Sequence, residues 1–248
     1  MSRRDPWLTL SLGVVEYQEA WDLQRRLVDA RQREVIGDVL VLLQHPHTYT
    51  LGRRATPEHL LWDERTLARK GIACFPVDRG GDVTYHGPGQ LVGYPIMNIR
   101  QRGVDVHGYL RGLEAALMRA LARYGISARQ DPAYTGVWVG DAKIAAIGVK
   151  ISRGVTSHGF ALNVNTDLGY FQGIVPCGIP DREVTSMERL LERPQDMGHV
   201  CETMIAAVVA EFGGDWRSAE LGALVLPSQA EGNEKPEVVS PSSHSLRE

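Results

Sequence analysis

A chain of 248 residues, 43% hydrophobic and 23% charged, can bury a substantial core and is too apolar to be disordered throughout. Its formal net charge of −3 provides no general attraction to nucleic acid or to an anionic membrane, so neither partner is expected. No apolar stretch approaches the ~20 residues that span a bilayer, and the N-terminus lacks a signal-peptide pattern. Three cysteines match neither a disulfide framework nor a zinc site, so we expect a reducing, cytoplasmic location.

The hydrophobic spacing along the chain predicts a succession of helices and strands. Amphipathic periodicity and end signals indicate helices over residues 17–33, 63–70, 106–124, 185–191 and 197–212. Short apolar runs bounded by turn residues indicate strands over residues 38–43, 72–77, 91–99, 135–139, 143–150 and 157–164. A tight turn at Gly140 and Asp141 is expected to join two of these strands.

The helix over residues 106–124 has the clearest signal. Asp105 is its expected N-cap, and Gly125 is its expected C-terminal stop. The apolar stripe consists of Val106, Tyr109, Leu110, Leu113, Leu117, Ala120, Leu121 and Tyr124. Farther along, Thr185 and Glu188 have the spacing of a capping box, which predicts a helix start there.

Strands and helices in this arrangement predict a single α+β domain with a mixed, largely antiparallel sheet flanked by helices. We expect the folded domain to span residues 1–226. Residues 227–248 are rich in Ser, Pro, Glu and Asn and have few large apolar side chains. Such a segment cannot offset its ordering entropy, so a disordered tail is expected.

Cys177 has the most unusual setting of the three cysteines. It lies within residues 173–180, between Pro176 and Pro180 and beside Gly178. Stiff proline backbone next to permissive glycine backbone suits the presentation of a reactive thiol. The alternative is a small buried hydrophobic side chain, which is the usual role of a free cysteine. That alternative is the interpretation for Cys74 and Cys201, which lie in apolar segments.

A glycine-rich run, RGGDVTYHGPGQ, spans residues 79–90. Its glycines would allow backbone N–H groups to approach a ligand closely, although a phosphate-binding loop should open a helix and this run precedes a strand. An ordinary glycine-rich connection is the alternative. His86 is expected to orient substrate or this loop. His158 is expected to precede a strand and receives no role.

Two histidines flank a proline at His45 and His47 and could suggest a metal pair. No third ligand follows at a suitable spacing, so these histidines are assigned to a loop and no metal is expected.

Three separated motifs resemble one family of enzymes. They are RGGDVTYHGPGQLVGYPI, GDAKIAAIGVKISRGVTSHGFALNVN and the PCGI around Cys177, together with HPHTYTLG at residues 45–52. Over roughly residues 10–215 the chain resembles the octanoyltransferases. The resemblance implies the fold of the biotin and lipoate protein ligase catalytic domains, and it makes residues 1–226 an acyltransferase domain.

The resemblance also implies an activity: transfer of an octanoyl or lipoyl group from acyl carrier protein to a lysine of a lipoyl domain, the first step of endogenous lipoylation. The acceptors would be 2-oxoacid dehydrogenases and the glycine cleavage H protein, and no cofactor would be needed. Carried over by motif, Cys177 would form the acyl thioester and Lys143 would be its partner. A nearby ammonium lowers a thiol pKa from its ordinary value of ~8.5, and Lys143 could later act as general base.

The same resemblance implies a substrate pocket. Its residues would be Arg79, Gly80, Gly81, Asp82, Val83, Thr84, Tyr85, His86, Ala146, Ile147, Gly148, Gly159, Phe160 and Ala161. Backbone N–H groups near Gly178 or in residues 79–86 are candidate oxyanion donors. Exposed arginines such as Arg53 and Arg54 could be solvated side chains or part of a docking patch for an acidic carrier protein.

Two alternatives remain at this point. An ATP-dependent lipoate ligase of the same fold would activate a free acid and would need no cysteine at position 177. A non-catalytic acyl-binding module would bind octanoate or carrier protein without turnover. The presence of both Cys177 and Lys143 favours the transferase.

Overall fold

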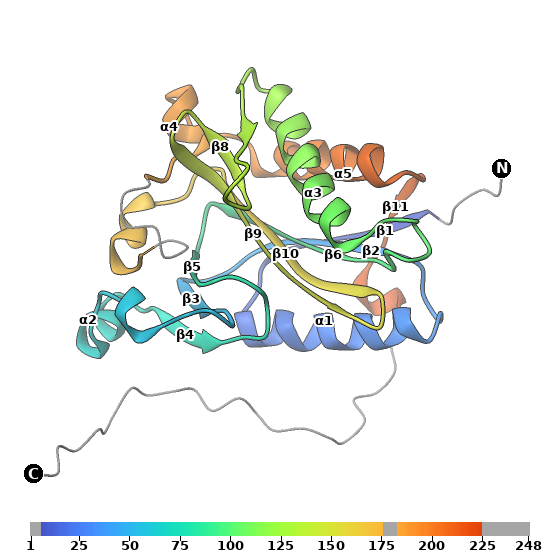
Figure 1. Cartoon of the computed structure of the whole chain (residues 1–248), viewed down its shortest axis with the longest axis horizontal. Coiled ribbons are helices and arrows are strands. Elements are labelled where there is room, and N and C mark those ends of the chain that lie inside the picture. Colours follow the sequence, from blue (N-terminus) through green and yellow to red (C-terminus); the bar gives the residue numbers. More distant parts are fainter. Residues whose placement is uncertain (1–5, 176–182, 225–248) are drawn as a thin grey trace, which may run out of the picture.

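A computed structural model describes residues 6–175 and 183–224, which form a large sheet with helices on both faces and a small second sheet (Figure 1). The helices are α1 (Tyr17–Gln32), α2 (Glu64–Arg69), α3 (Val106–Ala122), α4 (Met187–Leu191) and α5 (Met197–Phe212). The strands are β1 (Trp7–Val14), β2 (Val39–Gln44), β3 (Thr48–Leu51), β4 (Ala73–Pro76), β5 (Val83–His86), β6 (Gln90–Ile96), β7 (Arg129–Gln130), β8 (Val137–Val139), β9 (Ala142–Ser152), β10 (Val155–Asn163) and β11 (Trp216–Ser218). Short 3₁₀ turns occupy Pro57–His59, Leu168–Gly173 and Leu221–Ala223.

The large sheet has eight strands in the order β11-β1-β2-β6-β10-β9-β8-β7. β1 pairs in parallel with β11 and β2, and every later neighbouring pair is antiparallel. The small sheet has the order β4-β3-β5. The predicted α+β class with a mixed, largely antiparallel sheet is therefore confirmed.

The two faces of the large sheet are covered by different helices (Figure 1). α3 and α5 pack against one face and enclose the larger apolar core, which contains Leu113, Leu117 and Met204. α1 packs against the opposite face and buries Leu23 and Leu27 there. The small sheet lies beside α1, so the second face is only partly covered by a helix.

The contact between α3 and α5 depends on one glycine. A Cβ added to Gly112 would lie 2.8 Å from the Phe212 ring, so the small residue permits this close packing. α3 begins as predicted, with the Asp105 side chain accepting a hydrogen bond from the Gly108 N–H. Val106, assigned to the apolar stripe, is 52% exposed instead.

The other predicted helices and strands are present, with three corrections. The glycine-rich run is not one loop: it contains β5 and crosses from the small sheet to β6 of the large sheet. Ser186, not Thr185, caps α4, because its side chain accepts from the Arg189 N–H while Thr185 continues the backbone pairing with Lys143. The strands β1, β3, β5, β7 and β11 were not predicted. The predicted tail lies outside the described residues.

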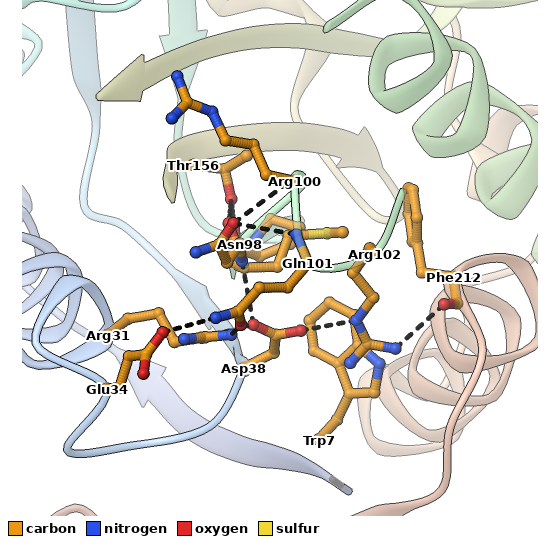
Figure 2. A network of polar contacts seen from close by, with 12 residues as sticks. Trp7, Arg31, Glu34, Asp38, Asn98, Arg100, Gln101, Arg102, Thr156 and Phe212 are labelled. Atoms are coloured by element: carbon orange, nitrogen blue, oxygen red, sulfur yellow. Dashed lines mark hydrogen bonds and ion pairs between the residues drawn. The ribbon is translucent and has the colours of Figure 1, made fainter. Parts of the chain in front are cut away.

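A buried ion-pair network centred on Asp38 joins α1, the start of β2 and the end of α5 (Figure 2). The Asp38 carboxylate accepts from Arg31 Nε and Arg102 Nε, each at 2.7 Å, and from the Asn98 N–H at 3.0 Å. Arg102 also donates to the Phe212 carbonyl at the end of α5. These contacts join α1, β2 and α5, and their buried charges are all paired.

Within the described residues, none of the helices has the length and apolar character needed to cross a bilayer.

Candidate active site

A β-bulge in β9 determines which face of the sheet carries Lys143. Val137 of β8 pairs with Ala145, but the next residue, Trp138, pairs with Lys143, so Ile144 is an extra residue in β9. Ile144 and Ala145 both point into the core beneath α3 and α5. Lys143 consequently shares the opposite face with Ala146, and both line one hollow. Bulges next to active sites commonly redirect a side chain in this way.

The Lys143 side chain is buried and held from two directions. Only 6% of the residue is exposed. Its Nζ donates to the Thr135 carbonyl at 3.4 Å and lies 4.7 Å from the centre of the Trp138 ring, where the cation interacts with the π system. Its backbone is fixed as well: the N–H donates to the Glu183 carbonyl and the carbonyl accepts from the Thr185 N–H.

A cavity opens on the same face of the sheet. It is a small cavity of about 50 Å³ that is partly open to solvent. Its lining residues are Tyr17, Arg79, Gly81, Asp82, Val83, Thr84, His86, Val92, Tyr94, Ala146, Ile147, Gly148, His158, Gly159, Phe160 and Ala161. A second, smaller hollow of about 10 Å³ shares Thr84, Ala146 and Ala161 with it and is lined by Lys143. The two spaces therefore adjoin, and the second leads to the lysine.

The floor of the cavity requires glycines. Gly148 of β9 pairs with Gly159 of β10. A Cβ on Gly148 would lie 2.9 Å from the Gly80 carbonyl oxygen and 3.0 Å from Arg79 Cδ, because the glycine-rich segment passes directly over this strand. A Cβ on Gly159 would lie 2.1 Å from the Gly93 carbonyl oxygen. These contacts explain why small residues recur in the second motif.

One part of the cavity wall is polar, and His158 is at its centre. His158 lies inside β10 with a left-handed φ of 55°, its N–H donating to Gln24 Oε1. Its Nε2 lies 2.8 Å from Asp78 Oδ1, and Lys150 Nζ is 2.5 Å from the other oxygen. Burial lowers the pKa of His158. Although burial opposes ionisation of Asp78, hydrogen bonds from His158 and Lys150 hold the pKa of that carboxyl well below its usual range.

Two further histidines near this wall are buried. Burial lowers the pKa of His45 to about 4 and the pKa of His86 well below its ordinary value. His45 contacts the Val15 carbonyl and the Tyr94 hydroxyl, and His86 contacts Gln90 Oε1 at 2.9 Å. These rings are therefore neutral at pH 7.

The structure places most of the predicted pocket residues around this cavity. The exceptions are Gly80, whose N–H donates to the Val149 carbonyl, and Tyr85, whose ring stacks on Tyr170 on the other side of β5. Tyr85 was misassigned because consecutive residues of a strand point to opposite faces. Cys177 lies outside the described residues.

The sequence reasoning missed four lining residues, Tyr17, Val92, Tyr94 and His158. Tyr17 and Val92 look like ordinary core positions in the sequence. The assignment of His158 before a strand was wrong, since it lies within β10. The one local signal was the run Ser157-His158-Gly159, in which a histidine precedes a glycine, and this run does not specify a contact.

The described residues on either side of the gap at 176–182 contact other parts of this region. Residues 59–61 pair with residues 173–175: Leu60 bridges Ile174, and the Val175 N–H donates to the His59 carbonyl. The His59 ring is itself held at the cavity wall, with Nδ1 2.6 Å from Asp82 Oδ2. On the far side, Glu183 accepts from the Lys143 N–H.

Cys74 and Cys201 pack against apolar cores, as expected. Burial raises the pKa of each thiol to about 11, so neither is a good nucleophile at neutral pH. Among residues 6–175 and 183–224, no group of three or more His, Cys, Asp or Glu side chains is arranged to hold a metal ion.

Solved structures with a similar fold are lipoate protein ligases. The bi-partite lipoate protein ligase from Thermoplasma acidophilum matches with a TM-score of 0.68 at 16% identity, covering 88% of this chain and 89% of that one. A lipoate-protein ligase A bound with ATP matches with a TM-score of 0.67 at 17% identity, covering 88% and 90%. The fold is therefore that of the lipoate protein ligases.

Sequence relatives define the family more narrowly. The family model described as the lipoyl protein ligase A/B catalytic domain matches residues 16–209. A Chloroflexus aggregans octanoyltransferase is 52% identical over 204 residues, which cover 81% of this chain and 92% of that relative. A Solibacter usitatus octanoyltransferase is 56% identical over 179 residues, covering 72% and 81%. The chain belongs to the lipoyl protein ligase A/B family and, within it, to the octanoyltransferases, a family of acyltransferases.

Proposed function

We propose that this protein transfers an octanoyl group from acyl carrier protein to a lysine of a lipoyl domain, through a thioester on Cys177. One observation carries the proposal: a cavity with an apolar wall leads along β9 to a buried lysine that a β-bulge turns onto the same face. The relatives are octanoyltransferases, and the fold is shared with a lipoate protein ligase solved in a study of an archaeal system that includes its E2 lipoyl domain.

The apolar part of this wall is the proposed place for the acyl chain. Ala146, Ala161 and Phe160 supply apolar surface without charge. Each buried methylene contributes about 0.8 kcal/mol, so an eight-carbon chain binds well without a charged anchor. A donor chain lying there would place its thioester toward the hollow that Lys143 lines.

The first half-reaction acylates the enzyme. The Cys177 thiolate, favoured by the Lys143 ammonium, attacks the donor carbonyl, forming one S–C bond and breaking the other. The carrier thiolate leaves and takes a proton from Lys143. Cys177 is two residues from Val175 and six from Glu183 in sequence; the Val175 N–H donates to the His59 carbonyl, and the Glu183 carbonyl accepts from the Lys143 N–H.

The second half-reaction moves the acyl group to the acceptor. Lys143, now neutral, takes a proton from the incoming ammonium, and the resulting amine attacks the thioester carbonyl. The amide forms as its nitrogen releases a second proton to solvent, and Cys177 leaves as a thiolate next to the restored Lys143 ammonium. One lysine thus serves both halves, and neither step requires ATP or a metal ion.

Intact-mass measurement tests the proposal directly. Incubation with octanoyl-carrier protein should add one octanoyl group to the full chain, and subsequent addition of a lipoyl domain should remove it. Cys177→Ala should neither gain the mass nor support transfer, whereas Cys201→Ala should do both. A fully active Cys177→Ala enzyme would exclude the mechanism.

The same assay separates the two alternatives. Lipoyl-domain acylation from free octanoate that depends on ATP would identify a ligase. Octanoate binding with neither an acyl-enzyme nor acceptor modification would identify a binding module.

A further inference from the structure

Glu114 is a buried carboxylate that the proposed reaction does not use. It lies on α3, its residue is 0% exposed, and it belongs to the helix face that otherwise buries apolar side chains. Burying a carboxylate is unfavourable unless it is paired and hydrogen-bonded. Arg111 Nη1 donates to one of its oxygens at 2.7 Å, and the Gly136 N–H donates to the other at 2.9 Å. The second contact ties α3 to the segment just before β8.

The hydrogen bond to Gly136 continues to Lys143 through a single peptide group. The N–H of Gly136 and the carbonyl of Thr135 are the two ends of one planar peptide and point in opposite directions. Glu114 accepts from the N–H end, while Lys143 Nζ donates to the carbonyl end at 3.4 Å. A carboxylate at the positive end of a peptide dipole and an ammonium at its negative end both favour this orientation.

Gly136 also limits where the lysine side chain can lie. Its φ of 132° is in the region that favours glycine. A Cβ there would be 2.8 Å from the Ala145 carbonyl oxygen and 3.2 Å from Lys143 Cε. The peptide held by Glu114 is therefore packed against the lysine side chain as well as hydrogen-bonded to it.

We propose that Glu114 is a positioning residue for Lys143, acting through the Thr135–Gly136 peptide. The proposal rests on the proposed function, in which Lys143 is the partner of Cys177. Glu114 contacts neither substrate nor thiol in this scheme; it fixes the peptide carbonyl that orients the ammonium. Without that carboxylate the peptide could rotate and the ammonium would lose its fixed position.

Three variants separate the hydrogen bond from the charge. Glu114→Gln keeps an oxygen that can accept from Gly136, so transfer should stay within about threefold of the wild type. Glu114→Ala removes the acceptor and should lower kcat about 10- to 100-fold with little change in KM for the octanoyl-carrier donor. Glu114→Asp retains the charge but is one methylene shorter, so it should also lose about tenfold, and it remains informative if Glu114→Ala does not fold.

Glu211 provides a matched control. It lies on α5 and pairs with Arg119 of α3 at 3.4 Å, away from Lys143. Glu211→Ala should leave transfer within about twofold of the wild type. Wild-type kcat in folded Glu114→Ala and Glu114→Asp, or a Glu114→Gln enzyme as impaired as Glu114→Ala, would overturn the proposal.

A double-mutant cycle excludes a merely structural role for Glu114. The rate of Cys177 alkylation by iodoacetamide, resolved by peptide mass spectrometry at pH 7, should fall about fivefold or more in Glu114→Ala. In a Lys143→Ala background the same substitution should have no further effect, because the positioned group is gone. An equal fall in both backgrounds would mean that Glu114 acts on the fold and not on Lys143. If Lys143→Ala alone changes neither alkylation nor transfer, the proposed pairing itself fails.

Discussion

The two faces of the large sheet are built for different purposes. The face beneath α3 and α5 is packed with apolar side chains such as Leu113, Leu117 and Phe212. The opposite face buries polar side chains, including Arg79 and His158, around a cavity. One layer of strands therefore separates the larger apolar core from the proposed site. Apolar substitutions beneath α3 and substitutions at the cavity should therefore affect different measurements, whereas Glu114 on α3 is expected to affect transfer through the Thr135–Gly136 peptide.

The largest effect is expected at Lys143. Lys143→Ala removes both the cation that favours the thiolate and the proposed general base, so transfer should fall about 10²- to 10⁴-fold. The free energy of unfolding should change far less than in a core variant, because the lysine borders a hollow. Octanoyl transfer to a lipoyl domain, measured beside urea unfolding, checks both parts. A large loss of stability with normal transfer would reverse the assignment of this face.

A loss of stability with little loss of transfer is expected for the apolar core beneath α3. Leu117 is 0% exposed in the larger core, so Leu117→Ala should lower the free energy of unfolding by about 2–5 kcal/mol. Transfer per folded molecule should stay within about threefold of the wild type. Urea unfolding combined with a rate assay in the absence of denaturant measures the two quantities. If kcat falls more than tenfold in the folded enzyme, the two faces are not independent.

Acid should lower the free energy of unfolding through His45, which is buried near the polar wall of the cavity. Its pKa is about 4 in the folded chain against an ordinary 6.5, so the unfolded chain binds the proton first as the pH falls. The stabilisation is complete above pH 6.5 and is lost between 6.5 and 4, by about 3 kcal/mol for this group at 1.36 kcal/mol per pKa unit.

Urea unfolding between pH 7.5 and 4.5 measures that loss. His45→Gln should flatten the pH dependence, and substitution of the exposed His107 by Asn should leave it unchanged. An unaltered slope in His45→Gln would contradict the assignment of a neutral buried ring.

The smallest effect is expected at Ala146, in the proposed acyl-chain site. Ala146 lines both the cavity and the adjoining hollow, so Ala146→Leu should fill space that the octanoyl chain occupies. We expect kcat/KM to fall about tenfold for an octanoyl donor and to change little for a butanoyl donor, a difference of roughly 1.4 kcal/mol. Ala122→Leu, at an exposed position on α3, is the control. Equal losses for both donors would place the acyl chain elsewhere.

The helix-covered core could largely be predicted from the sequence. The stripe on α3 and its Asp105 cap depend on residues close together in the chain, which is why the 3.6-residue period and the end signals find them. The resemblance to octanoyltransferases added the pocket segments, because three motifs in order specify a family even where spacing does not specify a contact.

The missed features depend on contacts between distant segments. The left-handed backbone of His158 requires Gln24 from α1, and the buried Glu114 requires the Gly136 N–H. Nothing local marks either residue as special. Strand alternation even predicts the wrong face for Lys143, since it assumes an unbroken two-residue period that β9 does not have.

The extra residue in β9 has a consequence for protein engineering. Copying the run from Gly140 to Lys150 into a regular sheet would aim Lys143 at the helices, because an uninterrupted strand places it with Ala145 and not with Ala146. A graft of this lysine must therefore reproduce the mismatch with β8 as well as the residue order. In this fold the proposed reactive amine reaches the cavity face through a local irregularity in strand pairing, because Ile144 and Ala145 both face the core and Lys143 therefore shares a face with Ala146.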